Sequence, residues 1–255
     1  MALLYNRFIL FVALASVWLV FMLAAGCASI DDEPAPLDPS SIHAAFFDTS
    51  IQFDLDESQQ GWEGNFSNYV SSFEDSLNLV FEHVALPKEF EVIGKGLKWT
   101  GFNYQNSLFM YGWRKISNLK PNTTYLISYD IAVGYQVELG NEFALRDHED
   151  KLNIKVGAIN YQPASNKDEV LGKILANFDK GSQQTIDGKD MIWLGELVVG
   201  DLKYKNKIAR NTDQRLFGIE TNSNGEMWAL VGVDSSVPLR HSVYFDTIIL
   251  YLKEQ

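Results

Sequence analysis

Apolar and polar residues alternate with a period of two along much of the chain after residue 45. This period places successive side chains on opposite faces of a β-strand. Strands are predicted around residues 51–55, 77–82, 108–113, 125–134, 152–158, 227–234 and 244–251. Helical periodicity is weak, and residues 166–176 have room for one short helix.

Turn-forming residues separate these predicted strands. Examples are Lys120-Pro121-Asn122, Asp187-Gly188 and Ser223-Asn224-Gly225. Many short strands punctuated by such turns are typical of an antiparallel β-sandwich. We therefore predict an all-β protein with a single jelly-roll sandwich over residues 45–255. This part of the chain has no cysteine, so its stability must come from packing.

The first 26 residues have the pattern of a secretory signal peptide. Arg7 precedes an apolar run, and the small residues Ala24-Ala25-Gly26 lead into Cys27, the only cysteine of the chain. The string before Cys27 resembles the bacterial lipobox. That resemblance implies cleavage before Cys27, diacylglycerol on its sulfur and a further acyl chain, such as palmitate, on its amine. A permanent transmembrane helix is the alternative, because the apolar run is close to the length that spans a bilayer.

Residues 27–44 contain many proline, aspartate and serine residues. Such a segment cannot bury enough apolar surface to order itself, so we expect a flexible tether between the lipid and the sandwich. Ala28 follows the cysteine. In Gram-negative bacteria this resembles the pattern for sorting to the outer membrane. The expected location is therefore extracytoplasmic and membrane-anchored, and on the outer membrane if the source is Gram-negative.

The net charge of the chain is -12. Nucleic-acid binding needs clustered basic residues, and electrostatic attachment to anionic lipid head groups needs them too. The composition therefore argues against both kinds of partner and leaves the lipid as the expected membrane contact.

Three motifs of the predicted sandwich resemble the galactose-binding-like jelly rolls of carbohydrate-binding modules. They are Gly61-Trp62, the turn from Leu119 to Tyr125, and Tyr244-Phe245-Asp246. The chain resembles even more closely a group of small secreted bacterial proteins of unassigned function. In the modules a structural Ca²⁺ often joins the first strand to the last. The matching oxygen donors here are Asp54, Asp56 or Glu57, and Asp246.

Aromatic residues are the main candidates for ligand binding. Phe109, Tyr111 and Trp113 share one face of a predicted strand, at a spacing of about 6.6 Å that suits flat rings stacking on sugars. We select Trp99, Tyr111 and Trp113 as the binding rings, with Asn103 as a hydrogen-bonding partner. Other rings that could join them are Tyr104, Tyr135, Trp193 and Trp228. The alternative is that these rings fill the core of the sandwich.

No pattern for a metal-dependent, nucleophilic or nucleotide-binding enzyme occurs in the sequence. Asp54 and Asp56 are the nearest approach to a glycosidase carboxylate pair, but they fall at the end of a strand. We therefore predict a non-catalytic lipoprotein whose sandwich binds a glycan or another extracellular ligand. A structural lipoprotein that docks a surface protein and a divergent glycan-active enzyme are the alternatives.

Overall fold

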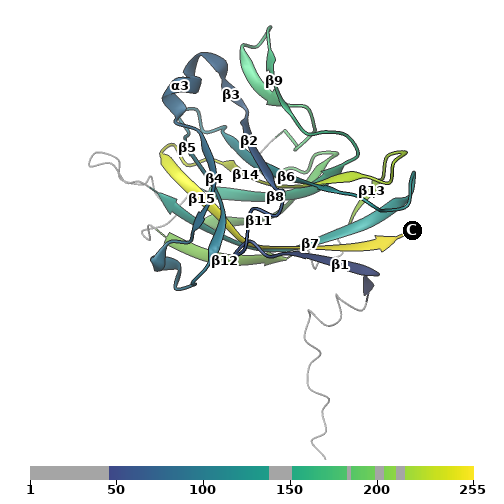
Figure 1. Cartoon of the computed structure of the whole chain (residues 1–255). Coiled ribbons are helices and arrows are strands. Elements are labelled where there is room, and N and C mark those ends of the chain that lie inside the picture. The colour runs from purple at the N-terminus through teal and green to yellow at the C-terminus, as the bar shows by residue number, and fades with distance from the viewer. Residues whose placement is uncertain (1–45, 138–150, 183–184, 199–203, 211–215) are drawn as a thin grey trace, which may run out of the picture. The chain divides into compact units, whose positions relative to one another are not determined.

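The computed structural model describes residues 46–137, 151–182, 185–198, 204–210 and 216–255. They lie in the compact unit Ile42–Gln255. Within this described part, antiparallel strands form two large sheets that pack as a β-sandwich, which confirms the predicted fold class (Figure 1). Among the described residues no helix is long and apolar enough to cross a membrane.

The larger sheet has the order β12-β7-β15-β5-β4, with β1 paired to β15 and β13 paired to β7. Its strands are β1 (Thr49–Phe53), β4 (Val80–Ala85), β5 (Lys95–Phe102), β7 (Thr124–Val137), β12 (Tyr204–Arg210), β13 (Phe217–Glu220) and β15 (Arg240–Glu254). The second sheet has the order β11-β8-β14-β6-β2. Its strands are β2 (Glu63–Ser67), β6 (Phe109–Ile116), β8 (Lys151–Ile159), β11 (Met191–Val198) and β14 (Met227–Ser235).

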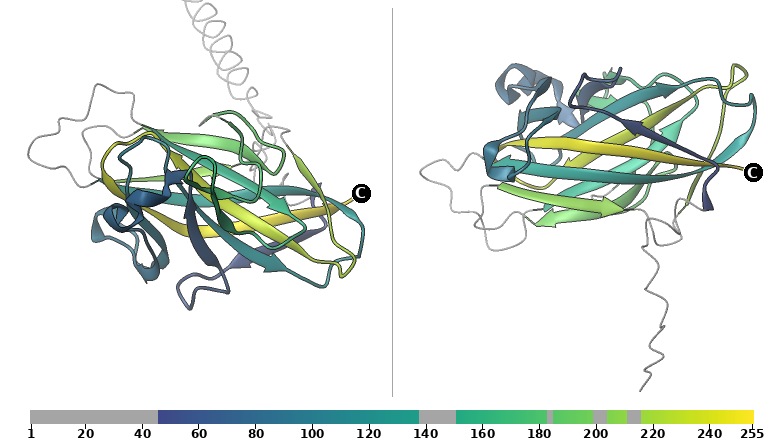
Figure 2. Two further views of the ribbon diagram at one scale, coloured as in Figure 1. Left: turned by 90° about the horizontal axis from the view of Figure 1, so that it is seen from above. Right: turned by 60° about the horizontal axis from the view of Figure 1, so that its bottom comes forward.

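The main core lies between these two sheets, and the alternation in the sequence explains it. Ile154 and Val156 of β8 and Val231 of β14 are buried in it, as expected for strands that turn one face inward. Figure 2 shows the layers in two further views. The strands predicted from residues 125, 152, 227 and 244 onward are all present.

Two local predictions were wrong. Residues 77–82 are not one strand, because Leu77 ends the short helix α3 (Glu74–Leu77) and Asn78 adopts a left-handed conformation before β4 starts. Residues 166–176 are not helical. They form a hairpin of β9 (Ser165–Asp168) and β10 (Lys173–Ala176), and β10 also pairs with β3 (Tyr69–Val70). In both places tight turns outweigh a weak apolar pattern. The remaining short elements are the single turns η1 (Ser71–Phe73) and η2 (Lys88–Phe90).

A second, smaller core covers the outer face of the five-stranded sheet. Phe178, which follows β10, packs over the rings of β6 there. The buried members of this cluster are Phe109, Tyr111, Trp113, Ile159, Phe178, Met191, Trp228 and Leu230. Both faces of β6 are therefore buried, one between the sheets and one under the chain that follows β8.

Candidate functional site

A hollow opens at one end of the sandwich, where the chain leaves β5 and enters β6. It is shallow: only about 10 Å³ is enclosed, roughly the room for one water molecule, and the rest of its empty space is open to solvent. Side chains from β3, η1, α3 and the loop after β5 surround it. The lining residues are Tyr69, Val70, Phe73, Leu77, Phe102, Asn103, Tyr104, Gln105, Ser107 and Leu108.

Two stacked rings form one wall of this hollow. The ring of Tyr104 lies on that of Phe102, with centroids 3.9 Å apart and planes 26° from parallel. Tyr104 is 56% exposed, and across the hollow Phe73 is 46% exposed. Because Phe102 supports one face of the Tyr104 ring, the tyrosine presents apolar surface to solvent in a restricted orientation. Exposed, supported rings of this kind suit stacking against a flat apolar face of a ligand.

Hydrogen-bonding groups beside the stacked rings are uncommitted. Neither the Tyr104 hydroxyl nor the Gln105 amide makes a side-chain hydrogen bond within the described part of the chain. The loop that carries them turns sharply, with Asn106 at a φ of 52° and its N–H donating to the Asn103 carbonyl over 3.4 Å. An apolar ring beside free hydroxyl and amide groups can bind a ligand that has both apolar and polar edges.

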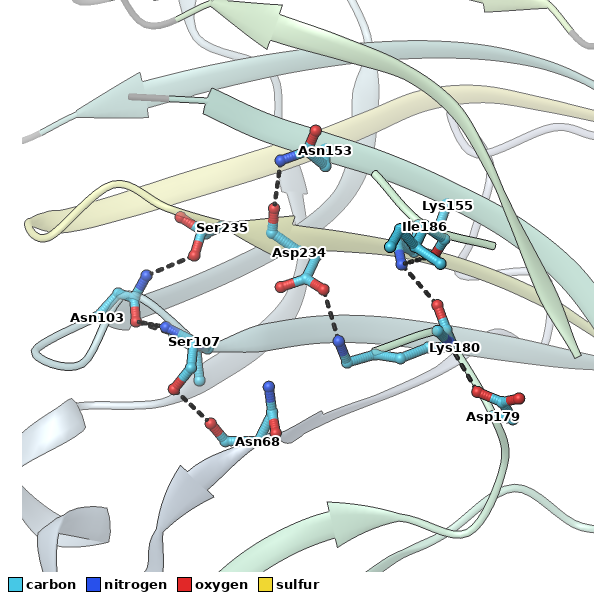
Figure 3. Close-up of polar contacts among 12 residues, drawn as sticks. Asn68, Asn103, Ser107, Asn153, Lys155, Asp179, Lys180, Ile186, Asp234 and Ser235 are labelled. Carbon is cyan, nitrogen blue, oxygen red and sulfur yellow. Dashed lines mark hydrogen bonds and ion pairs between the residues drawn. The ribbon is translucent and has the colours of Figure 1, made fainter. Parts of the chain in front are cut away.

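Asn103 supports this loop from below instead of facing a ligand. It is 2% exposed, and its Nδ2 donates to the Ser235 carbonyl over 2.8 Å. Its Oδ1 accepts hydrogen bonds from the Ser107 and Leu108 N–H groups over 2.9 and 3.0 Å (Figure 3). The polar atoms of Asn103 are thus occupied, and the predicted ligand-binding role is replaced by a structural one.

The three predicted binding rings are also buried, so they form no exposed platform. Trp99, Tyr111 and Trp113 are 1%, 0% and 7% exposed. Trp99 lies between the sheets and its Nε1 donates to the Tyr111 carbonyl over 2.9 Å. The alternative that such rings fill the core holds for all three, because both faces of β6 are covered.

The cover over Tyr111 comes from the chain that follows β8. The Phe178 ring meets it edge-on with centroids 5.0 Å apart, and the Tyr111 hydroxyl pairs with Ser165 Oγ over 2.8 Å. Burial raises the pKa of Tyr111 to about 12, and the Ser165 contact opposes that rise only in part. Nothing local to β6 in the sequence shows this contact, because the covering residues are far away along the chain.

Next to these rings is a buried polar network that we did not predict. Lys155 on β8 donates from Nζ to the Lys180 and Ile186 carbonyls over 2.6 and 2.9 Å, and Lys180 Nζ pairs with the Asp234 carboxylate over 2.5 Å (Figure 3). Burial, and then the nearby Lys180 ammonium, lower the pKa of Lys155 to about 8. These cations hold the loop around residue 180 onto the sheet. A lysine in an alternating strand pattern would ordinarily be assigned to the solvent face.

The predicted calcium donors lie near the far end of β5. Asp56 accepts a hydrogen bond from the Lys95 N–H over 2.7 Å, and Asp54 accepts one from the Asp56 N–H over 3.2 Å. Glu57 is exposed, and Asp246 lies at a bulge of β15. Burial, and then the Asp56 carboxylate, raise the pKa of Asp246. Over the described ranges no group of three or more acidic, histidine or cysteine side chains has metal-binding geometry.

The predicted signal peptide 1–26, Cys27 and the whole predicted tether lie outside the described residues. Lipidation and export therefore stay predictions.

No protein-family model matches the chain, and no curated protein matches it. Several solved structures are similar at low identity. One is the structure of the xylanase 10B modules of Clostridium thermocellum, a carbohydrate-binding module with a catalytic module, complexed with xylohexaose. It has 8% identity and a TM-score of 0.37, and the match covers 79% of this chain and 28% of that chain. The xylan-binding domain of Paenibacillus barcinonensis Xyn10C has 11% identity and a TM-score of 0.34, over 80% and 94% of the two chains.

An adhesin domain of Lys-gingipain from Porphyromonas gingivalis is similar to the same extent. It has 8% identity and a TM-score of 0.34, over 79% of this chain and 97% of that chain. The neighbours include carbohydrate-binding modules and an adhesin, and sandwiches of this kind serve unrelated functions. Similarity at this level carries no argument about the ligand, which has to be inferred from the residues of the hollow.

Proposed function

We propose that this protein is a non-catalytic glycan-binding lipoprotein, held on a membrane by lipid on Cys27, and that its sandwich binds sugar at the hollow beside Tyr104. The observation that carries the proposal is the Tyr104 ring, which is 56% exposed, stacked on Phe102 and next to the uncommitted Gln105 amide. Sugars have C–H faces that stack on such rings and hydroxyls that pair with amide and hydroxyl groups.

The chemistry of the hollow fits binding without reaction. Among its lining residues the polar side chains are hydroxyls and amides: Tyr69, Asn103, Tyr104, Gln105 and Ser107. Burial, and then the nearby Glu74, raise the pKa of Tyr69, so its hydroxyl stays protonated at neutral pH. General acid–base catalysis works best with a group whose pKa lies near the working pH, whereas ring stacking needs no titrating group.

The position of the hollow suits a protein anchored at its N-terminus. Thr49 of β1 pairs with Leu252 near the end of β15, whereas Phe102 beside the hollow pairs with Arg240 at its start (Figure 1). At about 3.3 Å per residue these positions are roughly 40 Å apart along the strand. Phe47 packs on Tyr251, which holds the start of the domain at the end remote from the hollow. A lipid before residue 45 would thus leave the hollow free to face outward.

Glycan binding is tested with the full chain, purified in a detergent that contains no sugar, on a panel of xylan, mannan, galactan and β-glucan. We expect retention of the chain by at least one polymer and loss of that retention in Tyr104→Ala. Tyr161→Ala is the matched control, because Tyr161 is 42% exposed but does not line the hollow.

Failure of the chain to bind every polymer would contradict the proposal. It would favour the alternative of a lipoprotein that docks a protein, for which Val170, 93% exposed, is the supporting observation. Release of shortened or unsaturated sugars would favour the enzyme instead.

The anchor has a separate test. Full chains with and without Cys27→Ala are produced in bacteria and partitioned between water and detergent. We expect the wild-type chain in the detergent phase. The Cys27→Ala chain, once its signal peptide is removed, should be in water. Wild-type protein in the aqueous phase would contradict lipidation.

A further inference from the structure

The hairpin β9–β10 ends in an apolar tip next to the hollow. Val170 and Leu171, at its turn, are 93% and 60% exposed. Large apolar side chains at such exposure are costly to leave in water, and when they are grouped they mark binding surfaces.

Hydrogen bonds hold this tip in one shape. Asp168 Oδ1 accepts from the Val170 and Leu171 N–H groups over 2.9 and 2.8 Å, and the Gly172 N–H donates to the Asp168 carbonyl over 2.8 Å. Gly172 has a φ of 64°, a conformation that a residue with a side chain rarely adopts. The two apolar side chains are therefore presented by a turn that is already ordered.

The same turn is bonded to the wall of the hollow. The Gly172 carbonyl accepts hydrogen bonds from the Ser71 N–H over 2.9 Å and from Ser71 Oγ over 3.0 Å. Ser71 lies between Val70 and Phe73, both of which line the hollow. Ser71 thus joins the wall of the hollow to the tip of the hairpin, and β3, α3 and β9 lie at the same end of the molecule in Figure 1.

Exposed apolar side chains at this end of the sandwich therefore come from three separate segments. They are Tyr104 after β5, Phe73 in η1, and Leu171 with Val170 at the hairpin tip. An enclosed pocket suits a small ligand, whereas an open apolar surface suits an extended one. Here one rim of the hollow is an exposed ring that leads onto a further apolar surface.

From this arrangement we infer that the ligand is an internal stretch of a polysaccharide, bound along a row from Tyr104 across Phe73 to Leu171. This inference rests on the proposed glycan-binding function and specifies its substrate class. One sugar unit lies on the Tyr104 ring beside Gln105, and later units of the same chain cover Phe73 and the hairpin tip. Affinity therefore depends on the length of the glycan.

The test measures binding of disaccharides and hexasaccharides by calorimetry, with the β-linked xylo-, manno- and gluco- series as probes and the full chain in a detergent that contains no sugar. The wild-type chain should bind the hexasaccharide of its preferred series more tightly than the disaccharide. Leu171→Ser should weaken hexasaccharide binding about fivefold, as expected for losing roughly 40 Å² of apolar contact, and leave disaccharide binding unchanged.

Ile93→Ser is the matched control. Ile93 is an exposed aliphatic residue like Leu171, but it precedes β5, and the hollow lies beyond the other end of that strand. Equal affinity for the disaccharide and the hexasaccharide, or an unchanged hexasaccharide affinity in Leu171→Ser, would overturn the extended site. If Tyr104→Ala still abolished binding in that case, the proposed function would stand. If no probe and no polymer bound the wild-type chain, the proposed function would fail.

Discussion

Tyr111 and Tyr104 lie close in sequence, and each follows a phenylalanine by two positions, yet one ring is buried and the other is exposed. Tyr111 lies within β6, is fully buried and is covered by Phe178, whereas Tyr104 lies in the loop beyond β5 and is 56% exposed. The difference lies in whether another segment of the chain covers the ring. A segment from elsewhere in the chain packs over one ring and leaves the other in water. A ring's residue type and spacing therefore do not reveal whether it can bind a ligand.

The largest expected effect is on stability when a ring between the sheets is removed. Trp99 packs against Phe81 and Phe245 with ring centroids 4.6 and 5.3 Å away. Trp99→Ala should lower the free energy of unfolding by about 3–5 kcal/mol, because it leaves a cavity in the core. Tyr104→Ala should change it by about 1 kcal/mol or less. Urea denaturation measures both free energies. Equal losses in the two variants would contradict the assignment of Trp99 to the core and of Tyr104 to the surface.

The next largest effect on stability is expected when Phe178, which covers the Tyr111 ring, is removed. Phe178→Ala should destabilise the fold by about 3 kcal/mol, since the phenylalanine is 7% exposed and packs on the rings of Phe109 and Tyr111. Because burial is the main cause of the raised pKa of Tyr111, that pKa should fall from about 12 toward the ordinary value near 10. Titration by NMR of labelled tyrosine measures it. Phe73→Ala is the control, and an unchanged Tyr111 pKa in Phe178→Ala would show that Phe178 is not the cover.

Acid should lower the free energy of unfolding through His241, a buried residue near the loop that carries Tyr104. His241 is buried, and its Nδ1 lies 2.9 Å from the Leu239 carbonyl, which also accepts the Asn103 N–H. Burial lowers the pKa of His241 to about 4. Between pH 6.5 and 4 the unfolded chain then binds a proton that the folded chain does not. Stability should therefore decrease as pH falls through that window, by up to about 3 kcal/mol.

The measurement is urea denaturation across this pH range, with His241→Phe as the comparison. The variant should show a flatter pH dependence below pH 6.5, whatever its stability at neutral pH. The same pH dependence of the free energy of unfolding in both proteins would show that His241 is not its cause.

Calcium is expected to have the smallest effect, beside the start of β5, at the opposite end of that strand from the hollow. If Ca²⁺ joins Asp56 to Asp246, it binds the folded chain alone and raises the melting temperature by mass action, by a few degrees. Melting the chain in calcium and then in chelator tests this, with Asp246→Asn as the variant that should lose the response. Identical melting temperatures in calcium and chelator would exclude the structural metal.

The sequence by itself determined the fold class and most of the long strands. Alternation at residues such as Ile154, Val156 and Val231 is a local property, set by the two-residue repeat of a strand with one face in a core. The turn at Ser223-Asn224-Gly225 was equally readable, since Gly225 adopts the positive φ that such a turn needs.

Only the tertiary structure decided which side chains meet solvent. Trp113 lies in an apolar strand, whereas Tyr104 lies between Asn103 and Gln105, and those polar neighbours do not show whether another segment covers its ring. The outcome depended on where the hairpin β9–β10 and Phe178 pack, and on the anchoring of that hairpin to Ser71. Such contacts join residues far apart in the chain, so burial is a property of the assembled layers and is not encoded in any short stretch of sequence.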